Sequence, residues 1–548
     1  MKASDLFLRC LEAEGVEYVF GLPGEENADV MISLLDSPIQ FITCHHEQGA
    51  AFMADLYGRM TGKPGVCLGT LGPGATNLMT GVANANMDRS PVVAITGQGA
   101  TTRLHKESHQ AMDVVGMFRP ITKWATSIHD ERTITEAVRK AFKLAQAEKP
   151  GATHLELPED IAKNDVDDEP IVPPVKVRRP VPDEKAIAAA VQLLREAEQP
   201  LLLVGNGCVR TRVTSQLQRF VEQTGAYATT TMMAKGAISD RDEHSLYMSG
   251  LGSRDHVIGA FEAADVVVAI GYDMVEWPPS RWNVGEPKRI LHIDFEPAEV
   301  DTAYRPHVEV AGDIAATLWA VNEALGDHRY SYSGIFSKTR ELLTYEIFEE
   351  HAQDAGMPMT PQRILMDLRA EMGDEDILIS DVGAHKMWTA RHYATYQPNT
   401  CIISNGFCSM GVALPGAIGA KLVHPDRNVV ALSGDGGFLM NVQELSTAVQ
   451  HGIAPVNMVW EDGEYGLIRW KQEISYGRHS HTELTNPDLV KLSESFGCHA
   501  VRIESADGLR PALREAFAVT DRPSVIVVPV DYRENMKLTQ RLGQEMPH

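Results

Sequence analysis

The stretch 428–467 constrains this chain more than any other. It begins with the apolar run NVVALS, continues with the turn GDGG (434–437), and leads into a segment whose apolar residues recur at helical spacing. A second apolar run, PVNMVW, ends in an acidic turn that contains Asp462. The pattern predicts a strand, a glycine turn, a helix, a second strand and an acidic turn. Parallel strands end at the same edge of a sheet, and ligands bind at that edge.

The residues of the two turns indicate what kind of ligand this edge would bind. The glycines allow backbone N–H groups to approach an anion at a helix N-terminus. Asp435 and Asp462 are 27 residues apart, so their carboxylates can meet at the edge of the sheet. Two carboxylates without a lysine suit Mg²⁺ bound to a diphosphate, and no Gly-Lys-Ser/Thr follows as in a Walker loop. The alternative is an ordinary crossover with a glycine turn and a solvated aspartate.

Composition limits the class of protein. A length of 548 residues predicts about three domains, and 44% apolar with 23% charged residues is typical of globular proteins. The N-terminal segment is an amphipathic helix pattern and not a signal peptide, and no apolar run is long enough to span a bilayer. Seven scattered cysteines without a CxxC pair predict a reducing, cytoplasmic location. The net charge of −24 argues against nucleic acid and anionic membranes as partners.

Strand and helix patterns alternate along most of the chain, which predicts an α/β protein built from doubly wound parallel sheets. We expect three such domains, at residues 1–165, 186–326 and 360–535. The segment 163–185 is rich in proline and charge and is predicted to be a surface linker. Residues 326–360 are predicted to form a second, mostly helical connector.

The GDGG turn followed by the second acidic turn resembles the binding motif of thiamine diphosphate (ThDP) enzymes. Nearly the whole chain resembles the acetolactate synthase family (the acetohydroxyacid synthase large subunit), in particular its catabolic, FAD-independent branch. The resemblance implies a pyrimidine-binding first domain, a central α/β domain and a diphosphate-binding third domain. It also implies a carboligase that uses ThDP and Mg²⁺ to convert two pyruvate molecules into 2-acetolactate and CO₂.

In the first domain, the segment HEQGAAFMADLYGR is similar to the family stretch whose glutamate, here Glu47, hydrogen-bonds the aminopyrimidine ring of the cofactor. Without the resemblance, Glu47 would be read as a first-turn glutamate that complements a helix dipole. The family's active-site glutamine corresponds to Gln110, preceded by His109, and Lys123 is a weaker candidate for substrate contact. The loop at 72–77 is expected to be either a wall of the active site or a simple turn.

In the third domain, the resemblance assigns the cofactor to a set of turns at strand ends. The implied cofactor-binding residues are Gly383, Ala384, His385, Cys408, Met410, Gly434, Asp435, Gly436, Gly437, Asp462, Tyr465, Gly466 and Leu467. Asp435, Asp462 and the backbone oxygen of Glu464 are implied as Mg²⁺ ligands. The alternatives are a surface role for His385 and ordinary core packing for Met410.

Two stretches depart from the biosynthetic members of the family. Residues 252–256 and 271–277 do not carry the flavin motifs, so we expect no FAD. The position that selects the acceptor substrate, Trp or Gln in relatives, is Lys471 in this chain. A lysine can pair with a keto-acid carboxylate, but it can equally lie on the surface, with Arg469 or Trp470 in its place.

Glu47 and the metal-binding residues belong to different domains. By the resemblance, the first domain of one subunit faces the third domain of another, which predicts a homodimer core and a homotetramer. Rival activities within the superfamily are simple decarboxylation, benzoin-type lyase chemistry and acetyl transfer. A non-catalytic regulator is the rival from another class, but such proteins usually lack the residues that Glu47, Asp435 and Asp462 supply here.

Overall fold

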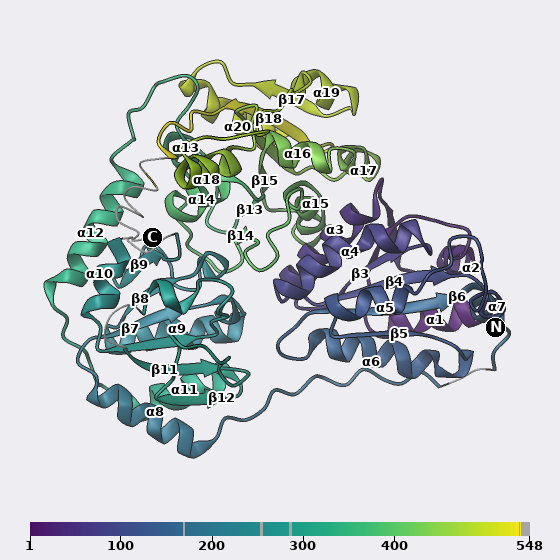
Figure 1. Cartoon of the computed structure of the whole chain (residues 1–548), viewed down its shortest axis with the longest axis horizontal. Helices are drawn as coiled ribbons and strands as arrows, with labels where there is room; N and C mark the ends of the chain where they lie inside the picture. The colour runs from purple at the N-terminus through teal and green to yellow at the C-terminus, as the bar shows by residue number, and fades with distance from the viewer. Residues whose placement is uncertain (168–169, 252–255, 284–287, 536–537, 539–548) are drawn as a thin grey trace.

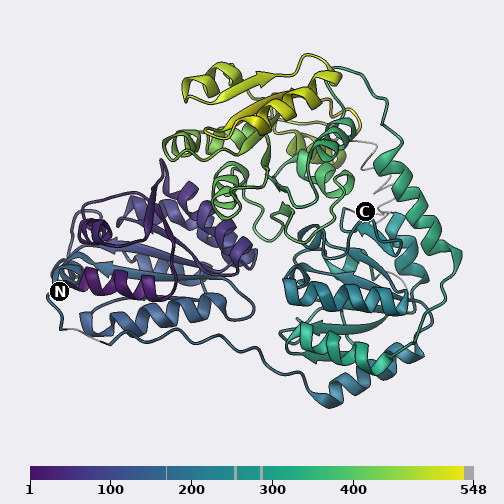
Figure 2. The same ribbon diagram turned by 180° about the vertical axis from the view of Figure 1, so that it is seen from behind.

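The computed structural model describes residues 1–167, 170–251, 256–283, 288–535 and 538. Figures 1 and 2 show three lobes, and each contains one six-stranded parallel sheet with helices packed against it. The predicted α/β fold class with three doubly wound sheets is therefore confirmed. In the described part of the chain, no helix has the length and apolar character needed to cross a membrane.

The first lobe contains a sheet of strand order β2-β1-β3-β4-β6-β5. Buried apolar residues on both faces explain the near-continuous apolar strand segments of the sequence, because a parallel sheet is covered on both sides. The elements are α1 (Ala3–Ala13), β1 (Tyr18–Gly21), α2 (Ala28–Ser33), β2 (Gln40–Thr43), α3 (Glu47–Thr61), β3 (Gly65–Gly69), α4 (Pro73–Met87), β4 (Val92–Gln98), α5 (Val114–Phe118), β5 (Trp124–Ser127), α6 (Ile134–Gln146), β6 (Ala152–Pro158) and α7 (Glu159–Lys163).

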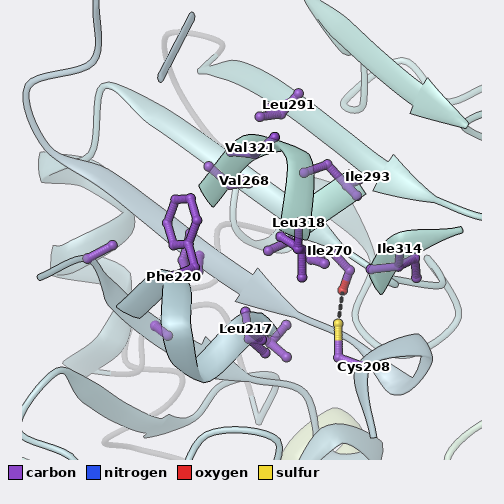
Figure 3. Close-up of a cluster of buried hydrophobic side chains, with 14 of the residues drawn as sticks. Cys208, Leu217, Phe220, Val268, Ile270, Leu291, Ile293, Ile314, Leu318 and Val321 are labelled. Carbon is purple, nitrogen blue, oxygen red and sulfur yellow. Dashed lines mark hydrogen bonds between the residues drawn. The ribbon is translucent and has the colours of Figure 1, made fainter. Parts of the chain in front are cut away.

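The middle lobe has the order β12-β11-β10-β7-β8-β9. Part of its core is shown in Figure 3, where the Cys208 thiol donates to the Ile270 carbonyl oxygen at 3.1 Å among buried side chains. The elements are α8 (Glu184–Glu196), β7 (Pro200–Val204), α9 (Thr211–Thr224), β8 (Tyr227–Thr230), β9 (Ser245–Met248), α10 (His256–Ala263), β10 (Val266–Ile270), β11 (Arg289–Asp294), β12 (Val308–Ala311) and α11 (Ile314–Leu325). The connector to the third lobe contains α12 (Gly334–Phe348), and Met359 at its end pairs with Val530.

The third lobe has the order β14-β13-β15-β16-β18-β17. The elements are α13 (Pro361–Glu371), β13 (Ile377–Ser380), α14 (Ala384–His392), β14 (Cys401–Ile403), α15 (Ala413–Val423), β15 (Val429–Gly434), α16 (Asp435–Met440), α17 (Glu444–Gln450), β16 (Val456–Glu461), α18 (Gly466–Tyr476), α19 (Leu489–Ser495), β17 (His499–Arg502), α20 (Leu509–Ala518) and β18 (Ser524–Pro529).

The first and third sheets share one topology. Counted from its own first strand, each sheet runs second, first, third, fourth, sixth, fifth. The segments SPVVAITG and NVVALSGDG are similar in sequence, but they are not equivalent strands, because the former is the fourth strand of its sheet and the latter the third. Their similarity reflects the apolar character that buried parallel strands share.

Glycines allow the first and third lobes to pack closely through α3, α4 and α15. A Cβ built on Gly81 of α4 would lie 2.5 Å from the Ala51 Cβ of α3. A Cβ on Gly419 of α15 would lie 2.5 Å from the Met53 carbonyl oxygen of α3. This contact holds α3, the helix that begins at Glu47, against both α4 and the third lobe.

Candidate active site

A cavity of about 90 Å³ lies at the carboxyl ends of the strands of the third sheet. It lies where the strand order reverses: the chain continues from β13 to β14 on one side and from β15 to β16 on the other. Such a reversal is the place where open α/β sheets bind ligands. Every residue of the third domain predicted to bind the cofactor lines this third-domain cavity, except Cys408. The lining residues from that prediction are Gly383, Ala384, His385, Met410, Gly434, Asp435, Gly436, Gly437, Asp462, Tyr465, Gly466 and Leu467.

Two aspartates bring negative charge to one side of the cavity. Asp435 is almost fully buried and accepts hydrogen bonds from the backbone N–H groups of Gly436 and Gly463, each at 2.8 Å. Burial and the neighbouring Asp435 carboxylate raise the pKa of Asp462 to about 7. Two carboxylates held together in this way favour a cation between them.

The lining set provides few other side chains for a metal. Glu464 also lines the cavity, but its carboxylate pairs with Arg469. Within the described ranges, no three His, Cys, Asp or Glu side chains converge as metal ligands. The donor set therefore fits a hard cation such as Mg²⁺, which takes few protein carboxylates and completes its shell with phosphate, water or backbone oxygens.

Asn486 was missed by sequence reasoning. Its side-chain amide donates to Asp435 Oδ2 at 2.7 Å, and its own Oδ1 is buried without a hydrogen-bond partner among the described residues. The segment reaches Asp435 because residues 482–484 pair with the acidic turn, as in the bond from Leu484 N to the Gly463 carbonyl at 2.7 Å. The only signal for Asn486 in the sequence is its place before Pro487 in a polar loop.

His385 is neutral and turned toward a buried space. It is 3% exposed, and burial lowers the pKa of its imidazole to about 3. Its Nε2 is buried and has no hydrogen-bond partner among the residues described. Gly383 and Gly434 lie against the ring, since a Cβ on Gly383 would be 2.7 Å from His385 Cε1. A neutral imidazole with one free nitrogen can hydrogen-bond a ligand in the third-domain cavity.

Glu47 belongs to a second cluster at the carboxyl edge of the first sheet. It is 8% exposed at the start of α3, and Asn77 of α4 donates to its Oε2 at 3.0 Å. A Cβ on Gly74 would be 3.2 Å from Glu47 Oε1. The segment 72–77, expected to be a loop, is Gly72 followed by the first turn of α4, and it contacts Glu47 directly, which explains its small residues.

Gln110 lies against Gly72, at the beginning of the same segment. Its φ is +55°, and a Cβ on Gly72, whose own φ is +53°, would be 2.9 Å from the Gln110 Cβ. Gln110 and His109 are both exposed. The structure thus brings Glu47 and Gln110 to Gly72 and the first turn of α4, but no residue of the first domain lines the third-domain cavity of the same chain.

Lys123, Lys471 and Cys408, which were also predicted to belong to the site, lie outside the cavity. The Lys123 ammonium donates to the carbonyl oxygens of Ala147 and Lys149 at 2.6 and 2.7 Å, at the amino end of β5. This is the edge of the sheet opposite Glu47. Lys471 is exposed on α18.

Cys408 has a φ of +60° in the loop before Met410. Its Sγ is 3.2 Å from the ammonium of Lys386, a buried residue of α14 that sequence reasoning also missed. The same ammonium donates to Asn405 Oδ1 at 2.7 Å. Lys386 therefore fixes the loop that carries Cys408 and Met410.

In the middle domain, the place where a dinucleotide would bind is filled by the protein itself. Its strand order is that of dinucleotide-binding sheets, with the reversal between β7 and β10. The carboxyl group of Glu276, 4% exposed, lies there and accepts from the backbone N–H groups of Asn206 and Asp273, each at 3.0 Å. The two loops also touch, since a Cβ on Gly205 would be 2.4 Å from the Gly271 carbonyl oxygen. Of the segments in which flavin motifs were sought, residues 252–255 lie outside the described residues.

Comparison with known proteins matches all three domains to one group of enzymes. Residues 1–117, 187–321 and 381–528 match the N-terminal TPP binding domain, the central domain and the C-terminal TPP binding domain of thiamine pyrophosphate enzymes. Thiamine pyrophosphate (TPP) is another name for ThDP.

Several curated proteins match over almost the whole length. Acetolactate synthase of Bacillus subtilis is 37% identical, with 98% of this chain and 94% of the relative covered. Catabolic acetolactate synthase of Raoultella terrigena is 35% identical, with 98% and 97% covered. The large subunit of acetolactate synthase isozyme 2 of Escherichia coli is 33% identical, again with 98% and 97% covered. The chain therefore belongs to the thiamine pyrophosphate enzymes and, among them, to the acetolactate synthase family.

Proposed function

We propose that this enzyme is a ThDP- and Mg²⁺-dependent carboligase that converts two pyruvate molecules into 2-acetolactate and CO₂. The observation that carries the proposal is the third-domain cavity, because it gathers the glycine turn, a neutral histidine and two adjoining buried carboxylates at one sheet edge. The names of the full-length relatives support the choice of reaction.

The residues of the cavity suit both a metal ion and the diphosphate that it would bind. Asp435, Asp462 and the backbone oxygen of Glu464 would hold Mg²⁺, and Asn486 would hold the Asp435 carboxylate in place. His385 and the backbone N–H groups at 434–437 would receive the diphosphate. Met410, which lines the cavity, would support the bent form of the cofactor, and the backbone at Cys408 would accept from its amino group.

When bound, ThDP supplies a centre that stabilises a carbanion during decarboxylation of a keto acid. Glu47 would hold a proton at the aminopyrimidine ring, and its burial beside Asn77 fixes the carboxylate for that task. Gln110 and His109 would orient the keto acid, and Lys471 would contact the acceptor.

We propose that the working unit is a homodimer, assembled further into a homotetramer in the cytoplasm. The support is that, within one chain, neither Glu47 nor Gln110 lines the third-domain cavity. A partner's first domain over the cavity would complete the site. The mass by light scattering, measured with activity over a dilution series, tests this: activity should fall together with the dimer, and an active monomer would contradict the proposal.

We also propose that catalysis needs no FAD. The support is the Glu276 carboxyl group, which takes the backbone donors that a nucleotide would use in a sheet of this order. The purified enzyme should lack flavin absorbance, and added FAD should leave its turnover unchanged.

Product analysis tests the reaction itself. The protein is incubated with pyruvate, ThDP and Mg²⁺ without FAD, and CO₂ is followed together with acetolactate, which is converted to acetoin by acid. One acetolactate per CO₂ is the expected result. Acetaldehyde in its place would make the enzyme a decarboxylase, and cofactor binding without turnover of any keto acid would indicate a regulator.

A further inference from the structure

A second cavity, of about 310 Å³, is lined by residues from all three domains. Arginine dominates its charged lining, although the chain as a whole carries a net charge of −24. The charged residues of this arginine cavity are Arg59, Arg89, Arg179, Arg210 and Arg212 against Asp88 and Glu148. Such an excess of guanidinium groups around one space favours an anionic ligand.

Arg59 lies at this cavity without a direct ion pair among the described residues. It lies near the end of α3, and its guanidinium donates only to neutral oxygens, Asn206 Oδ1 at 3.3 Å and the Met233 carbonyl at 3.1 Å. Its Nε is buried without a hydrogen-bond partner among the described residues. The carboxylates of Asp55, Asp88 and Glu276 act on it electrostatically, but none of them forms a direct ion pair with it. A buried guanidinium with an unused N–H at a hollow can receive a further anion.

Arg89 reaches the same space from a strained backbone. It follows α4 with a φ of +62°, a region that side-chain-bearing residues rarely adopt. Its Nε is also buried without a hydrogen bond, and its nearest carboxylate, that of Asp273, is 3.5 Å away. Strain of this kind persists where the surrounding structure holds a side chain in place, as at ligand sites.

Arg179 and Arg210 show how guanidinium groups in this cavity hold an anion. Each lies 3.1 Å from a different oxygen of the same carboxylate, that of Glu148. Both also stack against the Phe295 ring, which orients them. Arg179 also pairs with Asp313, at 3.4 Å, outside the lining of the cavity. The lining itself still has five guanidinium groups against two carboxylates, so the cavity keeps a positive charge.

The position in the fold points to phosphate. The cavity adjoins the turn between β7 and α9, the first strand-to-helix turn of a sheet with dinucleotide-binding strand order. In such sheets that turn and the helix N-terminus receive phosphate. At the strand reversal beyond it, the Glu276 carboxyl group takes the backbone N–H groups of Asn206 and Asp273, whereas the arginine cavity is open.

We propose that the arginine cavity binds a small phosphate-bearing anion, either inorganic phosphate or a small phosphate ester. Both helices that flank the Glu47 cluster end at this cavity, since Arg59 lies in the last turn of α3 and Arg89 follows α4. A bound anion therefore contacts the far ends of the helices that position Glu47 and the segment 72–77.

Calorimetric titration of inorganic phosphate into the holoenzyme, with ThDP and Mg²⁺ already bound, tests the proposal at constant ionic strength. Saturation with ThDP keeps phosphate out of the third-domain cavity, and binding is read without any turnover. We expect saturable binding that weakens about tenfold or more when one charge-assisted contact is removed, as in Arg212→Gln or Arg59→Gln. Arg305→Gln is the matched control, because Arg305 is exposed in the same domain and does not line the cavity.

Arg212→Gln keeps the test valid if Arg59→Gln does not fold, because Arg212 is exposed at the rim. Absence of saturable binding would overturn the proposal, and so would equal weakening in Arg212→Gln and Arg305→Gln. A parallel titration with glycerol 3-phosphate separates the two sources: binding at least as tight as that of phosphate identifies an ester, and weaker binding identifies the free ion.

Discussion

Replacing Gly419 by alanine tests whether close packing between α15 and α3 positions Glu47. The new Cβ would lie 2.5 Å from the Met53 carbonyl oxygen and 3.1 Å from its carbon, both backbone atoms of α3. Carbon–oxygen and carbon–carbon contacts settle near ~3.5 Å, so the helices must separate by about 1 Å. No side-chain rotation can relieve the contact.

The magnitude follows from two opposing terms. Overpacking in a tight core costs about 1–3 kcal/mol, and a clash with backbone belongs in the upper half of that range. Alanine in place of glycine inside a helix returns about 1 kcal/mol. The net loss is about 1–2 kcal/mol, which lowers the melting temperature of a domain of this size by roughly 2–8 °C.

The matched control is Gly334→Ala in the first turn of α12. A Cβ at Gly334 meets no atom within 4 Å, so this change should stabilise the protein slightly, by about 0.4–1 kcal/mol. Melting by circular dichroism and turnover of pyruvate are measured for both variants. Gly419→Ala should also lose up to ~100-fold in turnover, because α3 carries Glu47 and a shift of this size misplaces it. A Gly419→Ala variant that melts at or above the wild type would refute the packing argument.

Two further changes probe the site, and a third probes Glu444, a buried residue of α17 that accepts a hydrogen bond from the backbone N–H of His45, two residues before Glu47. Glu47→Gln should keep ThDP binding but lower turnover about 10²–10⁴-fold, measured beside the exposed control Glu136→Gln; near-normal turnover would remove Glu47 from the proposed mechanism. Asn486→Ala frees the Asp435 carboxylate and should weaken Mg²⁺ binding about 10–100-fold, read by titrating Mg²⁺ into apoenzyme with ThDP; an unchanged affinity would contradict its role. Burial raises the pKa of Glu444 to about 7, so the folded state favours the neutral acid and loses stability as the pH rises from about 4.5 to 7. The free energy of unfolding of Glu444→Gln should therefore rise above that of the wild type by up to about 3 kcal/mol between pH 5 and 8. Melting temperatures of the two proteins that change with pH in the same way across that range would show that burial does not protonate this group.

Local sequence patterns predicted the two turns of the third domain that carry Asp435 and Asp462. Asp435 and Asp462 each follow directly after one of two neighbouring parallel strands joined by one crossover, so their meeting at the sheet edge follows from the βαβ unit alone. Gly72 and Gln110 are a different case, because the resemblance named both, while only the structure shows that the missing side chain of Gly72 makes room for Gln110. Lys123 follows the family register, but its ammonium is bound to two carbonyl oxygens at the far edge of the sheet.

The sequence by itself determined the fold class and the third-domain turns, because the periodicity of apolar residues and the position of glycine act over a few residues at a time. Only the tertiary structure decided that Asn486 holds Asp435, that Glu276 binds the loop of Asn206 and that five arginines line one cavity. These contacts join segments that lie 51 to more than 100 residues apart. Their partners are set by how sheets and domains pack, and no local pattern in a single sequence encodes that choice.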